Sequence, residues 1–284
     1  MTAGAGRGGP LHQLAEVASQ RALGEDAYLL RLALPAFPPP APGQFVMLRL
    51  TETGEPLLGR AMAIYRTGRR GRRATIDIVY RRVGRGTALL AEAAPGCKLW
   101  VLGPLGGTFT LPGKGARPVI LGGGTGIASL YLLGQVLRRR GFADLDVLIG
   151  ARRKTQILCR KDFRELGARV RVATDDGSAG FGGTVTDLLA TLVKKEGSFD
   201  MAYVCGPTPM MEAAWRVCEG AGIACQVSLE GPMACGFGVC LGCAVPSRVD
   251  DPAAPVRAPR DRMKLMCMDG PVFDAATLAW GWDA

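Results

Sequence analysis

The chain has 284 residues, of which 48% are hydrophobic and 40 are glycine, and its net charge is +10. This length predicts about two domains with buried cores, and this composition excludes a disordered chain. No apolar run approaches the roughly 18 residues of a membrane span, and the first 14 residues lack the apolar centre of a signal peptide, so we expect a cytoplasmic protein without membrane attachment.

Short β-like segments separated by Pro and Gly fill residues 12–113. The predicted strands are Glu16–Ala22, Ala27–Leu34, Gln44–Leu50, Ala74–Arg82 and Lys98–Leu102. A short helix is predicted at Thr87–Glu92, and the proline-rich stretch Pro35–Pro42 is predicted to be a loop. Short strands at this spacing indicate a small antiparallel β-barrel, preceded by a flexible tail at residues 1–11.

Positive charge is concentrated in the second half of this predicted barrel. Nine arginines and a single acid, Asp77, lie between Arg60 and Arg85. The pattern predicts a hairpin with its tip at Thr67–Arg73. Because no aromatic residues in the tip could stack on bases, we expect no nucleic-acid binding, and a solvated tip or an anionic cofactor remains.

Strands and helices alternate in residues 114–230. The predicted strands are Pro118–Leu121, Leu145–Gly150, Val170–Ala173, Met201–Val204 and Ala224–Leu229. The predicted helices are Gly126–Arg140, Arg160–Leu166, Thr184–Lys194 and Thr208–Glu219. This alternation predicts an α/β domain, with a parallel sheet covered by helices on both faces.

A glycine-rich turn joins the first of these strands to its helix. It contains Gly122, Gly123, Gly124, Thr125 and Gly126. Such a turn lets the backbone approach a pyrophosphate at a helix N-terminus. Its spacing is G-x-G-x-G instead of the usual dinucleotide fingerprint, and no acid that could bind a ribose follows about 20 residues later. A glycine-rich packing turn is therefore the alternative.

Two acids follow the third strand of this domain. Asp175 or Asp176 can accept a hydrogen bond from an adenosine ribose and would repel a 2′-phosphate, which favours NAD over NADP. A plain Asp-Gly turn is the alternative. Arg152 and Arg153, after the neighbouring strand, would favour the phosphate instead.

Cys205, Gly206 and Pro207 end the fourth strand of the domain and lead into its last helix. They fall at the carboxyl edge of the sheet, where α/β folds bind ligands. We therefore interpret Cys205 as a contact of the nicotinamide, and not as a nucleophile. The alternative is a helix that simply begins at a proline.

Residues 231–284 lose this regularity and contain a cysteine cluster. Of the nine cysteines in the chain, Cys235, Cys240 and Cys243 lie within nine residues, and Cys267 follows. C-x₄-C-x₂-C with a remote fourth cysteine is the spacing of plant-type [2Fe–2S] ferredoxins. Structural zinc is the alternative, although its loops usually have the spacing C-x₂-C. A segment this short needs such a metal centre for stability.

In this order, the motifs resemble the ferredoxin–NADP reductase superfamily. More narrowly, the chain resembles the electron-transfer subunits of the NAD-dependent, B-type dihydroorotate dehydrogenases. The resemblance extends from about His12 to Phe273. It depends on Gly86-Thr87, the glycine-rich turn, Thr174–Ser178, Cys205–Met211 and, most specifically, Ser228–Cys243.

The resemblance implies three parts: a flavin-binding barrel, an NAD-binding domain and a C-terminal [2Fe–2S] lobe. It implies that FAD is bound by Arg60, Ala61, Met62, Ala63, Val79, Tyr80, Arg81, Gly86 and Thr87. It also implies that the cluster is bound by Cys235, Cys240, Cys243 and Cys267. The family usually has Arg-Pro-x-Ser at the flavin, whereas Ala61 and Ala63 replace Pro and Ser here. Ser129 stands where the family often has Pro, and Asp250–Arg262 is longer than usual and is expected to be a surface loop.

The resemblance implies an electron-transfer function in pyrimidine synthesis. NADH would reduce FAD, the cluster would relay single electrons, and the partner would be an FMN-containing subunit that oxidises dihydroorotate, in a heterotetramer of two subunits of each kind. One alternative is a reductase subunit of a hydrogenase or sulfide dehydrogenase. An alternative of another class is a non-catalytic iron–sulfur redox sensor.

Overall fold

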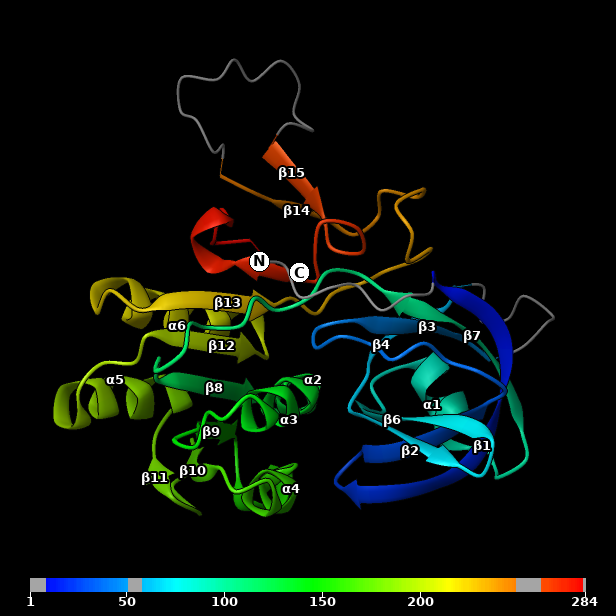
Figure 1. Ribbon diagram of the computed structural model, residues 1–284, viewed down its shortest axis with the longest axis horizontal. Helices are drawn as coiled ribbons and strands as arrows, with labels where there is room; N and C mark the ends of the chain where they lie inside the picture. Colours follow the sequence, from blue (N-terminus) through cyan, green and yellow to red (C-terminus); the bar gives the residue numbers. More distant parts are fainter. Residues whose placement is uncertain (1–8, 51–57, 249–261, 283–284) are drawn as a thin grey trace.

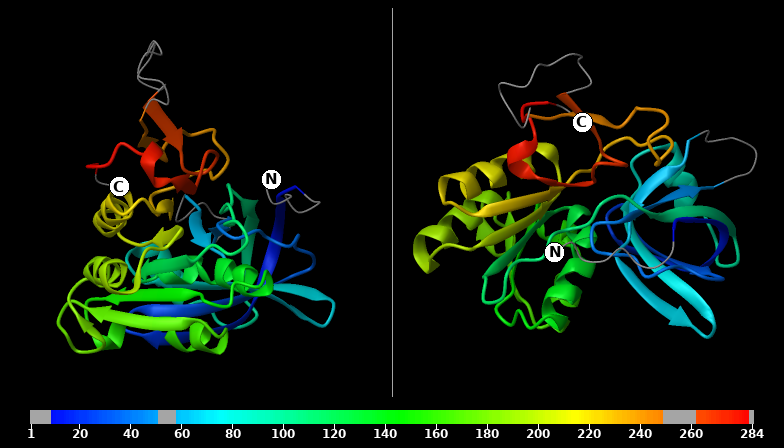
Figure 2. Two further views of the ribbon diagram at one scale, coloured as in Figure 1. Left: turned by 60° about the vertical axis from the view of Figure 1, so that its left-hand side comes forward. Right: turned by 45° about the horizontal axis from the view of Figure 1, so that its top comes forward.

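The computed structural model describes residues 9–50, 58–248 and 262–282. The structure has three parts: an antiparallel sheet, a parallel sheet with helices beside it, and a small C-terminal lobe that lies above both (Figure 1). Two further views show the lobe in contact with the other two parts (Figure 2). This arrangement confirms the predicted fold class.

The antiparallel part is a curled seven-stranded sheet in the order β4-β3-β7-β1-β2-β6-β5. Its elements are β1 (Leu11–Gly24), β2 (Ala27–Leu34), β3 (Phe45–Arg49), β4 (Arg60–Ala63), β5 (Arg66–Arg70), β6 (Arg73–Arg81), α1 (Arg85–Ala91) and β7 (Lys98–Leu105). Alternate residues such as Leu30, Leu32, Ile76 and Ile78 are fully buried, as a strand with one core-facing side requires. β1 begins at Leu11, inside the predicted tail, and residues 1–8 lie outside the described part.

The parallel sheet has the order β11-β10-β9-β8-β12-β13-β16. Its strands are β8 (Pro118–Gly123), β9 (Asp146–Ala151), β10 (Arg169–Thr174), β11 (Phe181–Gly182), β12 (Met201–Cys205), β13 (Ala224–Ser228) and β16 (Val272–Asp274). Its helices are α2 (Gly126–Ser129), α3 (Tyr131–Arg139), η1 (Lys154–Gln156), α4 (Arg160–Glu165), α5 (Val185–Glu196) and α6 (Thr208–Gly220). Helices α2, α3 and α4 pack on one face, and α5 and α6 on the other. The five predicted strands are therefore present, and β11 and the antiparallel β16 extend the sheet at its two edges.

The predicted helix Gly126–Arg140 was wrong as a single element, because the structure divides it at Leu130. The first turn is tight: the N–H of Ala128 donates to Thr125, and that of Leu130 donates to Ile127. These bonds span three residues and not four, which is a 3₁₀ pattern. The buried Ser129 hydroxyl also donates to the Gly126 carbonyl at 2.8 Å, within the same turn.

The C-terminal lobe has little core of its own. Its strands β14 (Ala244–Pro246) and β15 (Met263–Leu265) pair with each other, β16 joins the parallel sheet beside β13, and η3 (Ala275–Thr277) follows. Met233, Met266 and Phe273 share one apolar cluster with Trp215 of α6 and Phe45 of β3. The lobe is thus held by the other two parts. The predicted loop Asp250–Arg262 lies outside the described residues except for Arg262.

Polar contacts fix the antiparallel part against the parallel sheet. The Tyr65 hydroxyl donates to the Asp162 carboxylate at 2.5 Å, and Arg66 forms an ion pair with the same carboxylate. The Arg66 guanidinium also lies over the rings of Tyr65 and Tyr131, at 4.6 and 4.8 Å from their centres. Such partly buried, charge-assisted contacts hold two domains at a defined angle.

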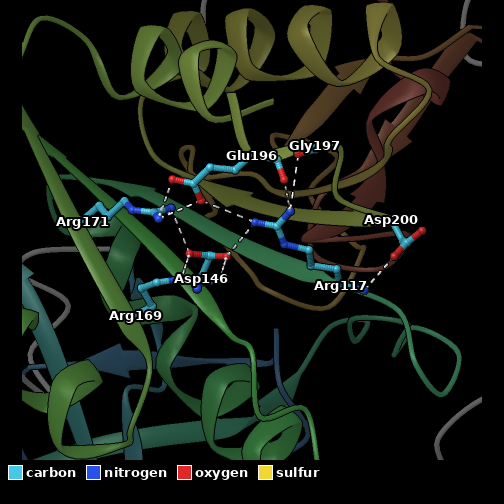
Figure 3. A network of polar contacts seen from close by, with 7 residues as sticks. All are labelled: Arg117, Asp146, Arg169, Arg171, Glu196, Gly197 and Asp200. Carbon is cyan, nitrogen blue, oxygen red and sulfur yellow. Dashed lines mark hydrogen bonds and ion pairs between the residues drawn. The ribbon is translucent and has the colours of Figure 1, made fainter. Parts of the chain in front are cut away.

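An ion-pair network closes the amino edge of the parallel sheet (Figure 3). The fully buried Asp146 accepts from Arg169 at 2.7 and 2.8 Å and from Arg171 at 3.1 Å, and Arg117 lies 3.5 Å away. Arg171 also donates to Glu196 at the end of α5. Since a buried carboxylate is stable only when paired, these arginines tie the starts of β8, β9 and β10 together. The opposite, carboxyl edge is left for ligands.

Across the described residues, no helix combines the length and apolar character that crossing a membrane requires.

Candidate functional site

Three adjoining cavities run along the carboxyl edge of the parallel sheet, where it faces the antiparallel part. Their volumes are about 370, 490 and 390 Å³, and we call them cavities 1, 2 and 3. Arg81 at the end of β6 lines all three, and Thr125 and Glu230 line both cavity 1 and cavity 3. The cavities therefore form one continuous groove between the parts.

Cavity 1 brings together the residues predicted for FAD. Arg60, Ala61, Met62, Ala63, Val79, Tyr80, Arg81 and Thr87 line it. Of the predicted set, only Gly86 does not. The other wall comes from residues that no sequence pattern marked for a flavin role, among them Phe45, Met233 and Pro271.

Gly86 contributes to cavity 1 indirectly, by supporting the side chain of Arg60. A Cβ built on Gly86 would lie only 2.3 Å from Nε and Nη2 of Arg60, so the guanidinium rests directly on this glycine. The Thr87 hydroxyl accepts from the backbone N–H groups of Val83 and Gly84, at 2.9 and 3.1 Å, and so fixes the start of α1. The result is a cation held at the wall of a cavity that combines apolar side chains with Arg81 and Glu230, and this lining fits an aromatic ring system carrying a pyrophosphate.

The glycine-rich turn divides into two roles. Gly123, Gly124 and Thr125 line the cavities, and Gly124 has a positive φ of 56°. Gly122 and Gly126 instead allow close packing. A Cβ on Gly122 would lie 2.5 Å from the backbone of Ile127, and one on Gly126 would lie 2.6 Å from that of Cys205. The alternative of a packing turn thus applies to Gly122 and Gly126, whereas pyrophosphate binding by the other residues of the turn stays a prediction.

Of the two candidate acids, only Asp175 faces a cavity. Asp175 lines cavity 2 with Arg152 and Gln156. Asp176 accepts the backbone N–H of Ser178 at 2.9 Å, and hydrogen bonds from Ser178 lower the pKa of its carboxyl. Asp176 therefore stabilises the turn, as the alternative interpretation expects.

Cys205 lies beneath the groove and Glu230 lies in it. Gly206 and Pro207 line cavity 3, whereas Cys205 is fully buried and donates to the Glu230 carboxylate at 3.6 Å. Burial, and then the charge of Glu230, raise the pKa of the Cys205 thiol well above its ordinary value. Cys205 is therefore a neutral thiol and no nucleophile. Contact between Cys205 and a nicotinamide stays a prediction.

Glu230 is the polar residue that the sequence interpretation missed. Its side chain is exposed and lines both cavity 1 and cavity 3, and desolvation by the protein around it raises the pKa of its carboxyl. A titratable group with a raised pKa at the junction of two cavities is typical of a functional site. Its only signal was a place in the motif Ser228–Cys243.

The four cysteines of the C-terminal lobe gather in two pairs. The sulfur atoms of Cys243 and Cys267 are 3.3 Å apart, and the thiols of Cys235 and Cys240 interact with each other. Burial raises the pKa of Cys235, but hydrogen bonds from the backbone N–H groups of Cys240, Phe237 and Val239 outweigh it and bring the pKa to about 6. Two cysteine pairs with backbone donors aimed at sulfur fit a cluster of two irons. Within the described ranges, no three ligating side chains converge as they do around a single metal ion.

Tight turns allow the cysteine loop to curve sharply between Cys235 and Cys243. Gly236 and Gly238 both have φ of +83°, and Leu241 also has a positive φ, of 58°. A Cβ on Gly236 would lie 2.5 Å from Met47 of β3. The loop is therefore packed against the strand that borders cavity 1.

Comparison of the sequence with known proteins identifies two domains and the family of the chain. Residues 230–279 match the iron–sulfur cluster binding domain of dihydroorotate dehydrogenase B, and residues 120–216 match the oxidoreductase NAD-binding domain. A relative from Desulforamulus reducens, named the electron transfer subunit of dihydroorotate dehydrogenase B (NAD(+)), is 38% identical over 84% of this chain and 87% of its own length. The chain belongs to this family. A relative of the same name from Bacillus caldolyticus is 37% identical over 91% of this chain and 95% of its own length.

Solved structures of other reductases share this fold. A chain of NADH-dependent reduced ferredoxin-NADP oxidoreductase has a TM-score of 0.78 and 28% identity, covering 94% of this chain and 90% of its own. The ferredoxin reductase of carbazole 1,9a-dioxygenase has a TM-score of 0.65 and 25% identity, covering 75% and 67%. The chain is therefore an oxidoreductase subunit with iron–sulfur and NAD-binding domains.

Proposed function

We propose that this chain passes electrons between NAD(H) and the FMN of a dihydroorotate-oxidising partner subunit, through bound FAD and a [2Fe–2S] cluster, in cytoplasmic pyrimidine synthesis. One observation carries the proposal: cavity 1 adjoins the nucleotide groove on one side and the cysteine loop on the other. The border between cavity 1 and the nucleotide groove contains Arg81, Thr125 and Glu230. The border between cavity 1 and the cysteine loop contains Met233, two residues before Cys235. Short transfer distances between three redox groups require such an order.

The protein residues supply binding and placement in this scheme. When bound, FAD accepts two electrons from NADH and releases them singly to a one-electron carrier. Arg60, held by Gly86, would pair with its pyrophosphate. Gly123, Gly124 and Thr125 would take the pyrophosphate of NAD(H), and the four cysteines would bind the cluster. Residues 12–113, 114–230 and 231–284 would then correspond to one cofactor each.

The experiment that tests the proposal uses the purified chain with its cofactors. It is expected to oxidise NADH with an artificial dye as acceptor and to leave dihydroorotate unchanged, because the three binding regions occupy nearly the whole chain and leave little of it for an orotate site. Turnover of dihydroorotate by the chain alone would contradict this division of labour. Failure to reduce the dye would favour a redox sensor instead.

Asp175 is expected to set the preference for NADH. A 2′-phosphate in cavity 2 would meet this carboxylate, and like charges repel. Asp175→Asn should therefore raise kcat/KM for NADPH about tenfold relative to NADH. Asp176→Asn is the matched control, because Asp176 does not line the cavity. Equal shifts in the two variants would show that general charge, and not contact, sets the preference.

The partner subunit is expected to dock on the cysteine loop. Phe237, Val239 and Leu241 are 51, 74 and 62% exposed, and Met268 lies beside Gly238 of the same loop. Exposed apolar side chains this close together are typical of an interaction surface. The proposed assembly contains two subunits of each kind.

Val239→Glu should weaken binding of the partner subunit by tenfold or more, since a charge would be desolvated in an apolar contact. Ser198→Glu, at an exposed position beyond the far end of α5, is the control. Analytical ultracentrifugation of mixed subunits measures the effect. Equal binding by both variants would place the partner elsewhere.

A further inference from the structure

The turn between β1 and β2 reaches across to the nucleotide-binding part. The carboxylate of Glu25 accepts from the Thr155 hydroxyl at 2.8 Å, from the Gln156 amide at 3.1 Å and from Arg153 at 3.1 Å. Hydrogen bonds from Thr155 and Gln156 lower the pKa of this carboxyl, so it is ionised at neutral pH. No sequence pattern signals this contact, because Glu25 and Arg153 lie 128 residues apart.

The turn itself is anchored. The neighbouring Asp26 has a φ of 49°, its carboxylate pairs with Arg82 at 2.9 Å, and its carbonyl accepts the backbone N–H of Arg82 at 2.8 Å. These contacts hold the turn that carries Glu25 against the residue that follows β6, and Glu25 lines a small pocket together with Arg81 of the shared groove.

Arg153 directly follows Arg152, which lines cavity 2. The residues on both sides of Arg153 are bonded to the turn that carries Asp175: the N–H of Asp176 donates to the Arg152 carbonyl at 3.2 Å, and the N–H of Lys154 donates to the Ser178 hydroxyl at 2.8 Å. Arg152 and Gln156 line cavity 2, whereas Arg153 does not. Its side chain is instead directed to Glu25.

We propose that Glu25 is a positioning residue that sets coenzyme selectivity by holding Arg153 away from the place where a 2′-phosphate would lie. This inference rests on the proposed binding of NAD(H) in cavity 2. Arginine is the side chain best suited to a phosphate, and a free Arg153 would add a second guanidinium to that of Arg152, which already lines cavity 2, and would so offset the repulsion from Asp175. The flavin-binding part thus contributes to specificity in a pocket that belongs to another part of the chain.

The test compares two ligands that differ only in the 2′-phosphate, ADP and adenosine 5′-diphosphate 2′-phosphate (2′-phospho-ADP), by titration calorimetry on the full chain with its cofactors. Wild type should bind ADP more tightly. Glu25→Gln keeps the shape of the side chain but removes its charge. It should raise the affinity for 2′-phospho-ADP relative to ADP about three- to tenfold, as expected for one exposed phosphate–arginine pair. The gain should shrink at high salt, where such pairs are screened.

Two further variants separate this role from general effects. Glu16→Gln makes the same charge change elsewhere, on β1, at a residue that pairs with Arg73 and not with Arg153, and should leave the ratio within about twofold of wild type. The double variant Glu25→Gln with Arg153→Ala should lose the gain. A gain in Glu16→Gln equal to that in Glu25→Gln, or a gain that persists in the double variant, would overturn the inference while ADP binding remained. Absence of ADP binding in wild type would overturn the proposed nucleotide site and the inference with it.

Discussion

A Cys240→Ser variant is expected to lose most of its iron and sulfide and the visible absorbance of the cluster, while the wild-type chain should contain about two of each per chain. Cys240 is exposed at the loop that turns through Gly236 and Gly238, and its thiol pairs with Cys235. Because the C-terminal lobe has little core of its own, loss of the cluster should also lower its resistance to proteolysis.

The control for this prediction is Cys97→Ser, which changes an exposed cysteine in the antiparallel part. It should retain the full iron content. NADH–dye activity should survive in both variants, since the path from cavity 2 to cavity 1 does not pass through the cysteine loop. Zinc in place of iron, in protein prepared without oxygen, would contradict the cluster assignment.

Gly86→Ala is expected to weaken FAD binding about ten- to a hundredfold. The added methyl group would occupy the place of the Arg60 guanidinium, which is the flexible end of a side chain and can move aside without unfolding the protein. Losing one charge-assisted contact to a pyrophosphate costs about 1.5–3 kcal/mol, which gives a loss of this size. Flavin content and fluorescence titration of the apoprotein measure it.

Gly84→Ala is the matched control for Gly86→Ala. Gly84 lies two residues earlier and has extended backbone with φ of −170°, and a Cβ added to it would meet no other atom within 4 Å. It should keep wild-type FAD affinity, with at most a small loss of helix stability from the poorer cap. Equal FAD affinity in Gly86→Ala and Gly84→Ala would remove Arg60 from the flavin site.

Local sequence patterns predicted most of the fold because the formation of strands and helices depends strongly on neighbouring residues. Short β-like segments between Pro and Gly predicted most strands of the antiparallel sheet, and short apolar runs alternating with helices predicted five strands of the parallel sheet. The strands β4, β5, β11 and β16 were not among those predicted. The ends of the five predicted strands of the parallel sheet located the nucleotide groove, since ligands of parallel sheets bind at that edge. The cysteine spacing located the C-terminal lobe for the same reason: four ligands within one short segment require little tertiary information.

The sequence predictions failed where contacts between distant segments determine the structure. The glycine-rich turn looked uniform, yet Gly122 and Gly126 serve packing against Ile127 and Cys205 while their neighbours face the groove. The helix is divided at Leu130, directly after the buried Ser129, whose hydroxyl donates to the Gly126 carbonyl. Glu230 and Glu25 gain their roles only when separate parts of the chain meet. No periodicity or spacing in the sequence encodes such meetings.

The most direct measurement of the central claim is dihydroorotate-dependent reduction of NAD⁺ by the chain and an FMN-containing dihydroorotate dehydrogenase subunit from the same cell. Neither subunit alone should reduce NAD⁺, and the mixture should do so at a rate that saturates at equal amounts of the two. The Cys240→Ser variant should abolish this rate in the mixture while keeping NADH–dye activity. NAD⁺ reduction that is independent of this chain, or unaffected by loss of the cluster, would contradict the account.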